Sequence, residues 1–150
     1  MITACREAGV ILAVDFEARY MADNVRVKQA VDEGRLGKMV LGEARLKWYR
    51  GHDYYEGWHG TWKYDGGGSL INQSIHQIDM LVWLMGTPKT VFGQIGVFTH
   101  DIETEDLGMA MIKFENGALG TILGTTTFPT SLPPRVEVHG DKGAAIVSGH

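Results

Sequence analysis

The stretch TWKYDGGGSLINQSIHQIDMLVWLMG, residues 61–86, decides how the rest of the chain is interpreted. From Ser69 onward its apolar side chains recur at intervals of three and four residues, the pattern of a helix with one buried face. The pattern ends at Gly86-Thr87-Pro88, because proline cannot continue a helix. The sequence therefore predicts one helix over residues 69–86, packed through Leu70, Ile71, Ile75, Ile78, Leu81, Val82, Leu84 and Met85.

Three consecutive glycines, Gly66, Gly67 and Gly68, stand directly before this helix. They match neither common phosphate-binding motif, because one needs the spacing G-x-G-x-x-G and the other needs a lysine beside its serine or threonine. Two interpretations stay open. The glycines form a flexible entry to the helix, or their missing Cβ atoms let the helix start pack against a cofactor or substrate. The N-terminus of the helix also offers free N–H groups to a ligand.

Asn72, Ile75, His76 and Asp79 fall on one face of the predicted helix. At that spacing we expect Asn72 to orient the ring of His76 from one turn earlier, and Asp79 to accept the other ring proton. A histidine held in this way is suited to proton transfer near neutral pH. The alternative is a structural histidine whose hydrogen bonds are satisfied inside an apolar helix.

A long aromatic segment, residues 49–63, precedes the glycines, and loops of this length in compact domains are usually functional when they are ordered. It contributes to an alternative metal site, whose ligands would be His52, Asp53, His59, His76 and Asp79. No pair among them has the spacing of the two histidines in the helical zinc motif, so the sequence favours no metal ligands. The acidic residues Glu103, Glu105 and Asp106 are interpreted as solvated charges at the start of a strand.

The N-terminal residues indicate part of a doubly wound domain. Residues 3–8 fit the last turns of a helix that Gly9 ends, and residues 10–14 form an unbroken apolar run typical of a strand buried in a parallel sheet. We therefore expect residues 1–17 to be the remnant of the last unit of a dinucleotide-binding domain. Residues 18–150 would then form a second, α+β domain, truncated at its C-terminal end.

The second domain begins with a helix and continues mostly as strands. Asp23 is expected to cap a helix that ends near Gly34. Strands are predicted over residues 39–48, 90–99, 107–128 and 135–148, with hairpin turns at residues 115–117 and 139–143. The predicted fold class is α+β, with an open, mainly antiparallel sheet and helices on one face.

Composition narrows the class of protein. The chain has 150 residues and a formal net charge of −4, which argues against nucleic-acid binding because such domains usually carry a basic surface. The one cysteine, Cys5, forms no disulfide within the chain, and a cytoplasmic location is expected in the absence of a signal-peptide pattern. No apolar run is long enough to suggest a membrane span.

Residues 61–86 resemble the signature of the Gfo/Idh/MocA oxidoreductases, the group around glucose–fructose oxidoreductase and inositol dehydrogenase. Four other segments strengthen the likeness: AVDFEARY and GRLG resemble the link between the two domains of the family, WHGTW its substrate loop, and ETEDLGMAMIKFENGALGTI its sheet. The resemblance covers nearly the whole chain.

The resemblance implies an N-terminal Rossmann domain that binds NAD or NADP, and a C-terminal α+β domain whose open sheet joins copies into a homo-oligomer. It implies hydride transfer to or from a carbon of a sugar or polyol. His76 matches the family's catalytic histidine, and Asn72 lies one turn earlier, where several members carry an aspartate; an asparagine cannot itself act as acid or base. The positions that match the substrate and cofactor cleft are Arg19, Tyr20, Trp62, Gly67, Gly68 and Gln73.

Two parts of the family pattern have no match in this chain: the dinucleotide-binding glycine motif, and the lysine of a Glu-Lys-Pro motif. We therefore expect that the chain alone binds neither NAD nor NADP tightly and is inactive alone, so the sequence leaves open whether it is itself an enzyme. The alternatives are a non-catalytic carbohydrate-binding or regulatory relative, and an assembly module that pairs through its apolar sheet face.

Overall fold

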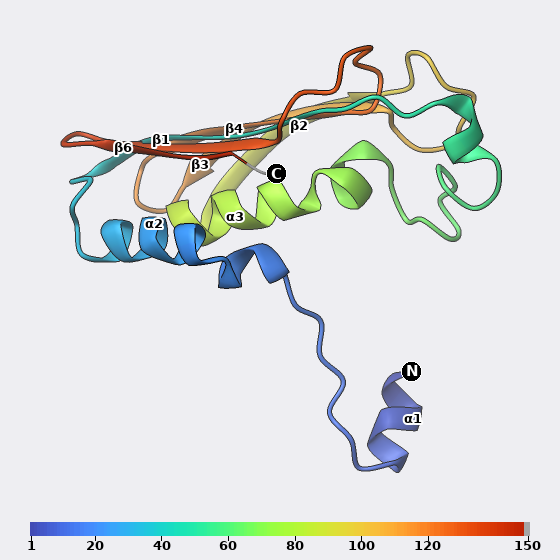
Figure 1. Cartoon of the computed structure of the whole chain (residues 1–150), viewed down its shortest axis with the longest axis horizontal. Helices are drawn as coiled ribbons and strands as arrows, with labels where there is room; N and C mark the ends of the chain where they lie inside the picture. Colours follow the sequence, from blue (N-terminus) through green and yellow to red (C-terminus); the bar gives the residue numbers. More distant parts are fainter. Residues whose placement is uncertain (149–150) are drawn as a thin grey trace.

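A six-stranded open sheet with helices on one face forms the body of the protein, as the computed structural model describes it over residues 1–148 (Figure 1). The strand order is β2-β3-β4-β1-β5-β6. The strands are β1 (Met39–Lys47), β2 (Pro88–Gly96), β3 (Leu107–Phe114), β4 (Leu119–Thr125), β5 (Arg135–Gly140) and β6 (Ala144–Ser148). The helices are α1 (Ile2–Glu7), α2 (Ala22–Asp32) and α3 (Ile75–Met85), with short helical turns at Glu17–Tyr20, His52–Tyr55 and Ser69–Gln73.

The pairing of the strands confirms a mainly antiparallel α+β fold. Both predicted hairpins form, β3 with β4 around Gly117 and β5 with β6 around residues 141–143. The one parallel pair joins β1 to β4, which were predicted as separate strands without a register. This pair places the end of β1, where the aromatic segment begins, beside the end of β4.

The hydrophobic core lies between α3 and the sheet. Leu81 and Met85 of α3 are almost fully buried and pack in one cluster with Phe114 and Val138 from the strands. Gly42 permits this close approach, because a Cβ atom there would lie 2.6 Å from a methyl group of Leu81. Helix α3 therefore packs directly on the backbone of the sheet at Gly42.

Helix α2 begins earlier than its sequence suggested. Met21 occupies the N-cap position and Asp23 lies in the first turn, so the prediction that Asp23 caps the helix is wrong. The anchoring side chain is instead Asn24, which is buried and donates a hydrogen bond of 2.7 Å to the carbonyl oxygen of Ala18. This bond ties α2 to the helical turn that precedes it.

The N-terminal residues form the expected short helix, but not the expected strand. α1 ends before Gly9, whose φ of +65° suits a helix stop. Residues 10–14 then run as an extended segment outside the sheet, with Ile11 and Val14 exposed to solvent (Figure 1). The segment therefore forms no strand in this structure, because no strand of the described residues lies beside it.

The segment predicted as one helix over residues 69–86 is divided in two. Residues Ser69–Gln73 form a π-helical turn, and the α-helical register starts only at Ile75. The widening has an identifiable cause. Glu105 accepts hydrogen bonds from the backbone N–H groups of Gly68 and Leu70, while the N–H of Ser69 donates to the carbonyl oxygen of Glu105. The π turn shifts every side chain before Ser74 relative to α3.

Candidate functional site

His76 lies in the first turn of α3, beside the helical turn Glu17–Tyr20. Its side chain is 42% exposed, and its Nδ1 atom lies 3.5 Å from Oε1 of Glu17. The ring of Phe16 meets it edge-on, with 6.2 Å between the ring centroids. Nδ1 is buried and makes no hydrogen bond within residues 1–148, so the carboxylate of Glu17 is the charged group beside it.

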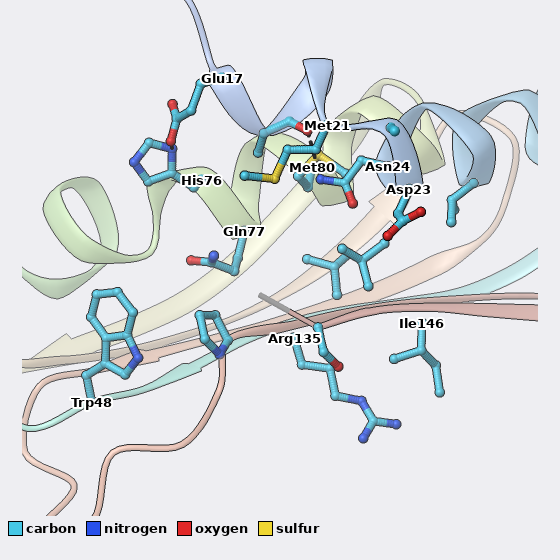
Figure 2. A pocket seen from close by; sticks show the side chains of 17 residues that line it. Glu17, Met21, Asp23, Asn24, Trp48, His76, Gln77, Met80, Arg135 and Ile146 are labelled. Atoms are coloured by element: carbon cyan, nitrogen blue, oxygen red, sulfur yellow. Dashed lines mark hydrogen bonds and ion pairs between the residues drawn. The ribbon is translucent and has the colours of Figure 1, made fainter. Parts of the chain in front are cut away.

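A cavity of about 680 Å³ opens next to His76, between the α2–α3 layer and strands β5 and β6 (Figure 2). His76 and Gln77 border it from α3, and Arg135 borders it from the opposite wall. Among the described residues, the side-chain oxygen of Gln77 is buried there without a hydrogen-bond partner, whereas Nε of Arg135 lies 2.6 Å from Oε1 of Glu137. An unpaired amide oxygen among apolar walls suits a polar ligand.

Asp79 does not serve His76, which corrects the expected contact between them. Both carboxylate oxygens of Asp79 accept hydrogen bonds from Arg19, at 2.7 Å and 2.5 Å. The hydrogen bond to Asp79 raises the pKa of Arg19 above its ordinary value. The guanidinium also lies over the ring of Trp83. Arg19, predicted as a cleft residue, therefore joins the Glu17–Tyr20 turn to α3, and so holds Glu17 beside His76.

Asn72 also has other partners than the predicted one. Its Nδ2 atom donates to Oδ1 of Asp65 at 2.5 Å and lies 3.4 Å from Nδ1 of His59. The expectation that Asn72 orients His76 assumed an unbroken α-helix, and the π turn before Ser74 removes the spacing on which that expectation depended. The structure thus separates His76 from Asn72 in their contacts, although both come from one segment.

The glycines pack against the protein itself. A Cβ atom on Gly68 would lie 1.8 Å from the carbonyl oxygen of Glu105, and one on Gly67 would lie 2.4 Å from the side chain of Ile71. Gly66 has a φ of +77° with open space around it. Because Gly68 has no side chain, the backbone of Glu105 can pack directly against it. The close packing at this glycine is therefore with the protein itself.

Two of the other predicted cleft residues, Gln73 and Trp62, contact or belong to the aromatic segment, and Tyr20 lies outside it. Gln73 is buried and donates from Nε2 to the hydroxyl of Tyr54. The backbone N–H of Trp62 donates to Glu103, while the Trp62 ring is half exposed. Tyr20 is largely exposed and is placed next to Arg19 by the chain.

The aromatic segment is ordered by stacking. The rings of Tyr54 and His59 stack with 4.2 Å between their centroids. The ring of Trp58 also packs against the ring of His59, with 3.7 Å between their centroids. The hydroxyl of Tyr55 lies 2.8 Å from Oγ1 of Thr126, and burial raises the pKa of Tyr55. The stack and the Tyr55–Thr126 contact hold the loop against itself and against the end of β4; its role as a functional loop stays a prediction.

Sequence reasoning missed a set of buried carboxylates. Asp106 is 0% exposed and Glu105 is also buried, so their interpretation as solvated charges is wrong. Asp106 accepts hydrogen bonds from three successive backbone N–H groups, those of Phe98, Thr99 and His100. The sequence offers no signal for this arrangement, because the donors come from a separate loop and acidic residues at strand starts are usually solvated.

Within residues 1–148, no three histidine, cysteine, aspartate or glutamate side chains are grouped closely enough to hold a metal ion. Across the same residues, no helix has the length and apolar character needed to cross a membrane.

Comparisons with known proteins agree with this fold. Residues 24–146 match the model of the GFO/IDH/MocA C-terminal domain. The chain is similar to the WlbA dehydrogenase from Bordetella pertussis, solved in complex with NADH and UDP-GlcNAcA, with 35% identity and a TM-score of 0.89 over 99% of this chain and 46% of that one. The WlbA dehydrogenase from Chromobacterium violaceum, solved with the same two ligands, gives 32% identity and a TM-score of 0.89, over 99% of this chain and 44% of that one.

Curated relatives give the same result at lower identity. The 1,5-anhydro-D-fructose reductase of Ensifer adhaerens is 26% identical over 97% of this chain and 44% of its own length. The chain thus spans less than half the length of such relatives. Because the family model matches most of the residues, the chain belongs to the GFO/IDH/MocA family, whose C-terminal domain it carries over residues 24–146.

Proposed function

We propose that the chain is the substrate-binding and oligomerisation domain of a longer NAD(P)-dependent oxidoreductase that acts on a carbon of a sugar or polyol. The names of its relatives support this class, since they include sugar and inositol dehydrogenases. Higher identity to two proteins solved with UDP-GlcNAcA makes a nucleotide-linked sugar our first choice of substrate. Residues 1–17 would then belong to the dinucleotide-binding domain, as their sequence pattern suggests.

The observation that carries the proposal is the state of His76. Its ring is partly exposed at the edge of a cavity, it has a carboxylate 3.5 Å away, and its Nδ1 makes no hydrogen bond to another described residue. Histidine is the side chain best suited to exchanging a proton near neutral pH. We therefore assign His76 the proton of the reacting hydroxyl group, exchanged through Nε2 because Nδ1 is buried, with Glu17 beside Nδ1 stabilising the ring when it carries that proton. Asn72, also a candidate catalytic residue by sequence, contributes hydrogen bonding only.

The residues of this chain do not fit the dinucleotide itself. In its run of glycines, Gly68 donates its N–H to Glu105 and packs against the backbone of that residue, so this N–H is not free to bind a diphosphate. Proton transfer, binding and orientation of the sugar are the steps that this chain supplies. Calorimetric titration of the chain with NAD or NADP should show no tight binding, whereas a stoichiometric tight complex would contradict an incomplete site.

Replacing His76 with alanine in the full-length protein tests the assigned role. We expect turnover of UDP-GlcNAcA, followed by NADH absorbance, to fall by about 10²–10⁴-fold, the usual contribution of a general acid or base. His139→Ala, a change of a partly exposed histidine on β5, serves as the matched control and should keep its turnover. Unchanged turnover in His76→Ala would remove the proposed role. Sugar binding that persists with no turnover even in the unmodified protein would favour a non-catalytic carbohydrate-binding relative.

We also infer that a second copy of the chain covers the open face of the sheet. β2, β3 and β4 present the exposed apolar side chains Phe92, Met109, Met111 and Leu119 there. Figure 1 shows α2 and α3 on the other side of the sheet. Apolar surface of this kind on a sheet is characteristic of an interface between copies.

A further inference from the structure

Asp65 is a buried carboxylate beside the glycines that sequence reasoning left without a role. Its side chain is 5% exposed. Oδ2 accepts a hydrogen bond of 2.9 Å from the backbone N–H of Gly60, and Oδ1 accepts one of 2.5 Å from Nδ2 of Asn72. Nδ1 of His59 lies 3.6 Å from Oδ2. Asp65 therefore links the aromatic segment to the π turn in front of α3.

These contacts determine which way the amide of Asn72 points. An ionised carboxylate can only accept hydrogen bonds, so Asn72 must turn its NH₂ group toward Asp65. The carbonyl oxygen of Asn72 is on the other branch of the planar amide and is directed away from Asp65. The backbone of Asn72 is held as well, because its N–H donates to the carbonyl oxygen of Gly68. A half-buried asparagine thus presents an acceptor of fixed orientation.

We propose that Asp65 is a positioning residue for sugar binding at the π turn: it orients Asn72 so that a carbonyl oxygen, and not an NH₂ group, meets a hydroxyl group of the sugar. The proposal rests on the proposed function for the identity of the ligand. It identifies one specificity contact, a hydrogen bond donated by the sugar. Asn72 takes no proton in this arrangement, so the contact acts on binding and leaves the chemical step to His76.

The two single exchanges of amide and carboxylate should each disturb this orientation. In Asp65→Asn, one oxygen remains for two donors. If that oxygen keeps the N–H of Gly60, the new NH₂ group faces Asn72, whose amide must reverse and turn its own NH₂ group toward the sugar. In Asn72→Asp, two carboxylates meet across the present 2.5 Å contact and repel each other.

The double exchange Asp65→Asn with Asn72→Asp should restore the arrangement. The asparagine at position 65 accepts from Gly60 through its oxygen and donates through its NH₂ group to the aspartate at position 72. The second oxygen of that aspartate then points toward the sugar, so an acceptor again occupies the same place. A side chain that served only to fill space would show no such recovery.

Kinetics of the full-length protein with UDP-GlcNAcA as the probe measure the effect on the ligand. We expect each single exchange to raise KM about tenfold or more with a smaller change in kcat, since an inverted donor leaves a polar group unpaired. The double exchange should recover most of that loss. Asp101→Asn, which removes one exposed carboxylate, is the matched control and should leave KM unchanged. Purely additive losses in the double variant would overturn the role of Asp65.

Stability of the same four proteins separates this inference from the proposed function. Urea unfolding should show that Asn72→Asp lowers the ratio of folded to unfolded protein and that the added Asp65→Asn restores it. Recovery in unfolding supports the orientation of Asn72 by Asp65, whether or not the protein turns over a sugar. A lack of sugar turnover overturns the proposed function and not this orientation. Independent effects of the two exchanges on unfolding would show that the two side chains do not act as a pair.

Discussion

Asp106 shows how a single residue organises the end of the sheet. Burial on its own would raise the pKa of this carboxyl group. The hydrogen bonds from Thr99, Phe98 and His100 outweigh burial, and the pKa of Asp106 is lowered below its ordinary value. The ring of His100 also lies 2.9 Å from the carbonyl oxygen of Arg50, so the ionised Asp106 connects the loop after β2 to the aromatic segment.

This lowered pKa predicts a dependence of stability on pH. A carboxyl group whose folded pKa lies below its unfolded value stabilises the fold fully above the unfolded pKa of about 3.9, and loses that contribution as pH falls through the folded pKa. Asp106→Asn should therefore cost about 1–3 kcal/mol of unfolding free energy at neutral pH, the usual loss when buried hydrogen-bond donors lose their acceptor.

The measurement is urea unfolding of both proteins from neutral pH down to about pH 3. The difference between them should shrink at the acidic end, because the unmodified protein loses its advantage there. A difference that stays constant over this range would show that the charge of Asp106 contributes nothing. Glu115→Gln, at an exposed position in the β3–β4 turn, provides a comparison without a buried charge.

The place of a side chain in a helix was predictable from the sequence where local apolar periodicity determines it. Apolar spacing predicted that His76 lies on a helix near its N-terminal end, and the family resemblance added its assignment. The partners of the polar side chains were not predictable, since Arg19 reaches Asp79 across 60 positions of sequence and Gly68 reaches Glu105 across 37. Contacts between residues so far apart in the sequence depend on how the sheet is assembled. The spacing of residues along one helix carries no information about that assembly.

At the scale of elements, the turn Ser69–Gln73 is the largest departure from what the sequence predicted. Residues 69–86 carry one continuous helical pattern, yet the structure changes from π to α geometry at Ser74. The cause lies outside the helix, in the backbone and side chain of Glu105. Strand existence and both hairpins were predictable because apolar alternation and turn residues are local signals.

Gly68→Ala tests the cause of this change. A methyl group would lie 1.8 Å from the carbonyl oxygen of Glu105, a backbone atom that cannot rotate away. We expect a loss of about 1–3 kcal/mol in unfolding free energy, typical of an overpacked site, together with faster amide exchange at Leu70. The matched control is Gly143→Ala, where the nearest atom is a methyl carbon of Leu36 at 3.3 Å. Equal stabilities of the two variants would contradict close packing at Gly68.

At the scale of the whole molecule, the sheet has two different faces. One face holds the core under α3, and Figure 1 shows the other without a covering layer. Alternation along β3 puts Ile112 into the core and Met111, 63% exposed, on the open face. The apolar excess of these strands was readable from the sequence. The parallel pairing of β1 with β4, which sets the shape of that face, was not readable, because no local signal fixes a register between distant strands.

The open face predicts self-association, and one substitution tests where it occurs. Phe92 and Met111 are direct cross-strand neighbours, so Met111→Glu places a charge in the middle of the apolar area. We expect the unmodified protein to be a dimer or larger by light scattering at micromolar concentration and Met111→Glu to be a monomer, because a buried unpaired charge costs more than a typical interface side chain contributes. Ile11→Glu is the comparison: this side chain is 94% exposed in the extended N-terminal segment. If Ile11→Glu dissociates the protein and Met111→Glu does not, copies associate through the N-terminal segment and the open sheet face is not the interface.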